Sequence, residues 1–131
     1  MHEFHAWVGL SDSPYEDDDA RIIEVADELR QLVETADWET ATFTLNNLNG
    51  TFFLNADGFA NRRRDEAQLL DRLLAIVLEK LPGSWGVVYE RDDEAQITPG
   101  SNAFLARVIA RGVIVTRLDP FLSPCNPTIE D

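Results

Sequence analysis

Three kinds of side chain in this sequence could carry chemistry: two histidines, one cysteine and a dense run of carboxylates. His2 and His5 are three residues apart on a predicted strand, so they point to opposite faces and cannot chelate one metal ion together. Cys125 could pair with a histidine as a nucleophile, but it lies among prolines in the C-terminal tail with no glycine-rich turn before it. Phosphate-binding loops, dinucleotide fingerprints and Gly-x-Ser-x-Gly motifs are also missing. We therefore expect no enzymatic site, no metal and no cofactor.

The carboxylates gather directly after the first predicted strand. This acidic stretch holds one tyrosine and five carboxylates: Asp12, Tyr15, Glu16, Asp17, Asp18 and Asp19. Its spacing is not that of a calcium-binding loop. Acidic residues in the first turn of a helix are each favoured by about 0.3–1 kcal/mol through the helix dipole, but one or two satisfy that need. The four consecutive acidic residues from Glu16 to Asp19 repel each other. We assign the carboxylates beyond the one or two that the helix needs to partner binding.

The overall composition limits the class of partner. The 131 residues include 24 acidic and 11 basic ones, a net charge of −13, so the chain should repel nucleic acid and anionic membranes and attract a basic protein or a cation. An alternative is that the charge serves only solubility. The 44% of hydrophobic residues predicts one folded domain. Without a long apolar run, a signal peptide or a second cysteine, the chain is expected to be cytoplasmic.

The predicted elements form an α+β protein. The first strand, His2 to Leu10, is apolar on both faces, which is typical of the interior of a sheet. A helix follows, with Ser13 as its N-cap or with a later start at Asp17 or Asp18. A second helix is expected from about Asp65 to Leu81, where Pro82-Gly83 stops it.

The other predicted strands complete the sheet. Ala41 to Ala56 is expected to be a hairpin whose Asn49-Gly50 turn sets Leu48 opposite Thr51 and Leu45 opposite Leu54. Later strands are predicted at Trp85 to Glu90, Ala103 to Ala110 and Val113 to Leu118. Arg91 to Glu94 reads as an acidic turn. The order β-α-β-β-α-β-β, with Val113 to Leu118 as a further short strand, predicts a two-layer sandwich. A mainly antiparallel sheet should carry both helices on one face and the first strand near its centre.

A surface is the remaining candidate site. The sheet face opposite the helices should hold Trp7 and Phe53, with Trp85 or Tyr89 nearby, and aromatic side chains ringed by carboxylates suit a basic partner. The alternative is that a long loop or the apolar tail from Asp119 to Asp131 covers these aromatics and makes a second small core. The predicted partner-binding residues are Trp7, Asp12, Tyr15, Glu16, Asp17, Asp18, Asp19, Asp92, Asp93 and Glu94.

Several stretches resemble the Immunity protein 7 family of bacterial polymorphic toxin systems. They are Met1 to Leu10, Ser13 to Asp19, Leu48-Asn49-Gly50, Pro82 to Gly86, and the tail from Asp119 to Cys125 with Glu130-Asp131. The resemblance covers essentially the whole chain and implies a protein that binds and neutralises a toxin encoded next to it. It carries over no catalytic or interface residue. With the acidity of the chain, it suggests occlusion of a basic, nuclease-type toxin.

Two other functions fit the residues. One is an acidic regulatory or scaffold domain that binds an endogenous partner, and the other is a small hydrolase that works through His5 or Cys125.

Overall fold

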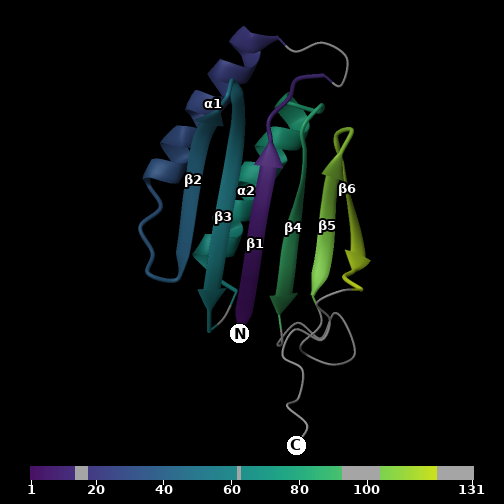
Figure 1. The fold of residues 1–131 in the computed structure, drawn as a ribbon. Coiled ribbons are helices and arrows are strands. Elements are labelled where there is room, and N and C mark those ends of the chain that lie inside the picture. Colours follow the sequence, from purple (N-terminus) through teal and green to yellow (C-terminus); the bar gives the residue numbers. More distant parts are fainter. Residues whose placement is uncertain (14–17, 62, 93–103, 121–131) are drawn as a thin grey trace, which may run out of the picture.

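The computed structural model describes residues 1–13, 18–61, 63–92 and 104–120 (Figure 1). Its elements are β1 (His2–Gly9), α1 (Asp19–Glu34), β2 (Ala41–Leu48), β3 (Thr51–Ala60), α2 (Asp65–Lys80), β4 (Trp85–Asp92), β5 (Leu105–Ala110) and β6 (Val113–Leu118). This order confirms the predicted α+β class. The tail beyond residue 120, which we expected to lie along the body, is outside the described residues.

One antiparallel sheet holds the described strands, in the order β2-β3-β1-β4-β5-β6. The first four strands have the split βαβ arrangement, and β5 with β6 extends it as a further hairpin. The strand β1 pairs with β3 on one side and with β4 on the other, so the predicted central position of the first strand is confirmed. Both helices lie behind the sheet on one face (Figure 1).

The core lies between the sheet and the helices. Alternate residues of β1, such as Phe4 and Val8, point to the helix side and are fully buried there with Leu29 of α1 and Leu73 of α2. Gly58 of β3 is needed beside this core, because a Cβ at that position would lie 2.3 Å from the ring of Phe4. The apolar side of each helix thus packs against the apolar side chains that alternate along the strands.

The hairpin of β2 and β3 follows the predicted register. Leu48 pairs with Thr51 and Leu45 with Leu54. Asn49 and Gly50 have φ angles of 53° and 90°, the positive values that a two-residue type I′ turn requires. The hairpin runs four residues further than predicted, because β3 continues along β1 as far as Ala60.

The helix α1 begins after Asp18. The Oδ1 atom of Asp18 accepts a hydrogen bond from the backbone N–H of Arg21, so the later of the two predicted starts is correct and the start at Ser13 is not. The residues before Ser13 contact the loop that precedes β4. The N–H of Gly83 donates to the carbonyl of Asp12, and the N–H of Ser11 donates to Ser84.

The strand β4 is longer than predicted. We expected Arg91 and Asp92 in an acidic turn, but they continue the strand and pair with Glu3 and His2 of β1. Nε of Arg91 also donates to a carboxylate oxygen of Glu3 at 2.8 Å, and this interaction holds the end of the strand in place.

In the part of the chain that the structure describes, neither helix is long and apolar enough to cross a membrane.

Candidate functional site

The sheet face opposite α1 and α2, here called the open face, carries most of the exposed apolar surface. Alternation along each strand directs one set of side chains away from the core. Ten large hydrophobic residues are exposed in the described part of the chain, and seven of them lie on this face: Trp7, Leu48, Phe59, Trp85, Val108, Val113 and Val115. Exposed hydrophobic residues are usually scattered singly over a protein surface. Their concentration on one face is typical of an interaction surface.

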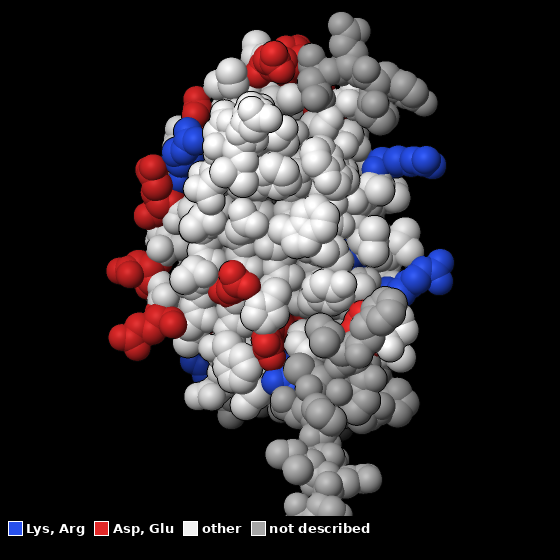
Figure 2. All heavy atoms as spheres, viewed as in Figure 1, with Lys and Arg blue, Asp and Glu red and all other residues white. Residues whose placement is uncertain are grey.

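Charge lies mainly along the flanks of this face, apart from an ionic cluster with carboxylates such as Asp57 at one end of it. Figure 2 shows the open face as a largely uncharged surface, with many carboxylates on the side of α1 and basic side chains on the side of β6. The hairpin of β5 and β6, from Leu105 to Leu118, contains Arg107, Arg111 and Arg117 and no acidic residue. The apolar surface therefore has an acidic flank and a basic flank.

Trp85 is held against the sheet by its neighbours. Its ring lies over Gly9 of β1, where a Cβ atom would be only 2.5 Å from Cζ2 of the indole. The ring of Phe53 meets the indole edge to face, with 6.2 Å between the ring centroids. The side chain of Trp85 is still 42% exposed, and that of Trp7, further along β1, is 44% exposed. Two half-exposed tryptophans are thus available to a partner.

An ionic cluster occupies the other end of the open face. Nδ1–H of His5 donates to Asp57 and Nε2–H donates to Glu3, each at 2.6 Å, and Glu3 also accepts from Arg91. Partial burial lowers the pKa of His5, but the hydrogen bonds and negative charges of Glu3 and Asp57 outweigh it and raise that pKa above 6.5. The cluster joins β3, β1 and β4 through Asp57, Glu3, His5 and Arg91, so it holds the strands together.

A second ionic cluster lies on the helix side. The carboxylate of Glu90 is 2.7 Å from Nε2 of His2 and 3.0 Å from the guanidinium of Arg107. Burial raises the pKa of Glu90, but the hydrogen bond from His2 and the nearby positive charges lower it overall. His2 is buried while His5 is exposed, so the two histidines face opposite sides of the sheet as predicted.

The described residues of the acidic stretch lie where β1 ends and α1 begins. Oδ1 of Asp12 is 3.4 Å from Nε of Arg21, and Asp18 caps the helix at the backbone of the same residue. The carboxylate of Asp19 makes no ion pair or hydrogen bond within the described parts of the chain. Tyr15, Glu16 and Asp17 are outside those parts.

Asp92 does not join this acidic stretch. It pairs with His2 at the start of β1, whereas Asp12 follows the end of that strand. At about 3.3 Å per residue, the eight residues of β1 separate the two ends by roughly 23 Å. The strand register therefore places Asp92 at the opposite end of β1 from Asp12, and its role in partner binding stays a prediction. Asp93 and Glu94 lie outside the described residues.

Sequence reasoning missed the three valines of the open face. Val108, Val113 and Val115 come from β5 and β6, whose strands are apolar at nearly every position. Alternation alone cannot tell which side of such a strand is uncovered. They are placed on this face by the pairing of Val108 with Val87, which lies opposite Trp7, and the sequence does not give that pairing. Residues 93–103 and 121–131, which include the proposed cover for the aromatics, are not described.

Comparison with known families identifies the chain. Residues 1–131, the whole length, match the family model described as Immunity protein 7. No curated protein and no solved structure gives a significant match. The match agrees with the resemblance seen in the first strand, the acidic stretch and the tail. This chain therefore belongs to the Immunity protein 7 family, and it is an immunity protein whose partner is a cognate toxin.

Proposed function

We propose that this immunity protein neutralises its toxin by binding it with the open face and the acidic end beside it, and thereby covers the toxin's working surface. The observation that supports this most is the collection of seven exposed hydrophobic side chains on one face of the sheet. A face of this kind gains free energy when a partner removes it from water, by about 25 cal/mol for each Å² of apolar surface.

The toxin domain is proposed to be basic, and a nuclease-type enzyme is the class that fits best. Nucleases carry positive surfaces because they bind phosphate. A net charge of −13 would attract such a surface over a long range and speed the encounter. The tryptophans would then slow dissociation, since buried aromatic residues are frequent hot spots of protein interfaces.

Protection would then come from occlusion in the cytoplasm of the producing cell, without catalysis. The two ionic clusters support this mechanism, because their carboxylates already have hydrogen-bond or ion-pair partners within the fold.

The test begins with growth. The toxin domain encoded next to this protein is expressed in a naive bacterium with and without the wild-type chain. We expect toxicity that disappears only when the two are expressed together. If soluble wild-type protein gives no protection, either the toxin or the function is wrong.

The face is then tested with two variants and an inactive toxin domain. Trp7→Ala removes a half-exposed side chain from the open face and should raise the Kd by about 30-fold or more, a hot-spot effect. Leu118→Ala is the matched control, because this equally exposed residue points to the other side of the sheet. Equal effects of the two variants, measured by calorimetry, would place the interface elsewhere.

A further inference from the structure

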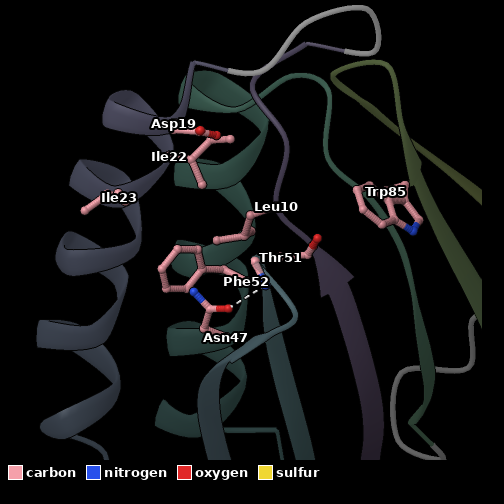
Figure 3. A pocket seen from close by; sticks show the side chains of 9 residues that line it. Leu10, Asp19, Ile22, Ile23, Asn47, Thr51, Phe52 and Trp85 are labelled. Carbon is pink, nitrogen blue, oxygen red and sulfur yellow. Dashed lines mark hydrogen bonds between the residues drawn. The ribbon is translucent and has the colours of Figure 1, made fainter.

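A small pocket lies at the end of the sheet, between the first turns of α1, the turn of the β2–β3 hairpin and Trp85 (Figure 3). Its volume is about 260 Å³. That is below the usual size of a pocket for a small organic ligand, roughly 300–1,000 Å³. It is large enough for one long side chain from another protein.

The lining combines an apolar base with a charged rim. Leu10 and Ile22 are buried and form the base together with the ring of Phe52. Asp19 stands at the rim, close to Ile22 and above Leu10 and Phe52 in Figure 3. The side-chain oxygen of Asn47 already has a partner within the hairpin, since its Oδ1 accepts a hydrogen bond from the N–H of Gly50. The pocket therefore offers apolar contact and one carboxylate.

Asp19 differs from the other described carboxylates at this end of the molecule. Asp12 is beside the guanidinium of Arg21, and Asp18 holds the first turn of the helix. Arg21 itself donates from Nε to the carbonyl of Lys80 and does not line the pocket. The charge of Asp19 is thus left without a cation in the described residues. The net charge of −13 adds to the attraction for one.

We propose that this pocket receives one cationic side chain, an arginine or a lysine, of the toxin domain. The aliphatic stem would lie on Leu10, Ile22 and Phe52, and the charged head would reach Asp19 at the rim. Trp85 belongs both to the pocket and to the open face, so a toxin seated on that face would reach the pocket without a gap. This inference rests on the proposed function, because it names a contact within the same complex.

The test compares two variants of equal charge. Asp19→Asn and Glu24→Gln each remove one carboxylate from the exposed surface of α1, but Glu24 does not line the pocket. Binding of both to the inactive toxin domain is measured by surface plasmon resonance. We expect Asp19→Asn to raise the Kd at least tenfold, mainly through a faster dissociation rate, and Glu24→Gln to change it less than about threefold.

The partner side chain is then found by double-mutant cycles. Each arginine and lysine of the toxin domain is changed to Ala and measured against both the wild type and Asp19→Asn. One toxin variant should weaken wild-type binding at least tenfold and have almost no further effect on Asp19→Asn, and its identity distinguishes arginine from lysine. If Asp19→Asn behaves like Glu24→Gln, or if no toxin residue is coupled to it, the pocket proposal is overturned. Failure of the wild type to bind or protect would instead overturn the proposed function.

Discussion

His5 shows how one side chain on the open face links stability to pH. Both of its ring nitrogens donate to carboxylates, and its pKa in the folded chain is raised above 6.5. The folded state therefore holds the extra proton more tightly than the unfolded state does. This contribution to stability is fully present below pH 6.5 and is lost as the pH rises through the higher folded pKa.

His5→Gln should remove that dependence. We expect the difference in unfolding free energy between the wild type and His5→Gln to be larger at about pH 6 than at about pH 9, as measured by urea denaturation. The ring is half exposed, so solvent screening keeps the effect small. An NMR titration of the His5 ring provides the independent check. A ring pKa at or below 6.5 would contradict the prediction.

The face on which a single residue lies was predictable where it depends only on the alternation of side chains along a strand. Trp7 was correctly placed on the face opposite the helices, because its neighbours on the strand had to point into the core. The distance of Asp92 from the acidic stretch could not be predicted, because it depends on which residue of β1 Asp92 pairs with. A period of two residues gives the face of a side chain but not its place along the sheet.

At the scale of the element, α1 depends on its cap. Asp18→Ala should lower the unfolding free energy by about 1 kcal/mol, since the N–H of Arg21 loses its acceptor. Asp18→Ser should restore most of that loss, because serine caps nearly as well. Both values come from urea denaturation. Equal destabilisation by the two variants would show that the negative charge matters more than the hydrogen bond.

The same helix shows why element boundaries were harder to predict than elements. Ser13 and Asp18 are both good capping residues, so local chemistry allowed either start. The helix begins after Asp18, and Ser11 and Asp12 are hydrogen-bonded to the loop at Gly83 and Ser84, some 70 residues away in sequence, which no local pattern shows. Asn49-Gly50 was predictable because its turn is a local device that fixes the register by itself.

The whole molecule carries far more negative than positive charge, and this repulsion should respond to salt. Raising NaCl from about 10 mM to about 150 mM shortens the screening length from about 30 Å to about 8 Å. We expect the Tm to rise over this range, because self-repulsion in a chain of net charge −13 weakens. The ion pairs within the clusters of Glu90 and His5 act over short distances, so salt weakens them less than it weakens the long-range repulsion. Thermal unfolding followed by circular dichroism measures the shift, and a falling Tm would mean that attractive pairs dominate.

The net charge of the chain was the basis for predicting a basic partner, but it does not show how the charge is distributed over the molecule. The β5–β6 hairpin contains only arginines among its charged residues, while the start of α1 is acidic. The sum over the chain cannot reveal this division. It implies that the proposed toxin surface should be basic where it meets the acidic end and neutral or acidic beside Arg111 and Arg117. Arg107 is not part of this flank, because it points to the helix side and is paired with Asp71 and Glu90.

The central position of β1 also delays the completion of the sheet during synthesis. The first strand to leave the ribosome has its two partners in β3 and β4, and the second of these ends at Asp92. At about 5–20 residues per second, roughly 4–17 s pass between the synthesis of Gly9 and that of Asp92. During that time the centre of the sheet is missing. A chain cut short before β4 would lack Trp85, which the pocket and the open face share, so under the proposed function only molecules translated beyond β4 would protect.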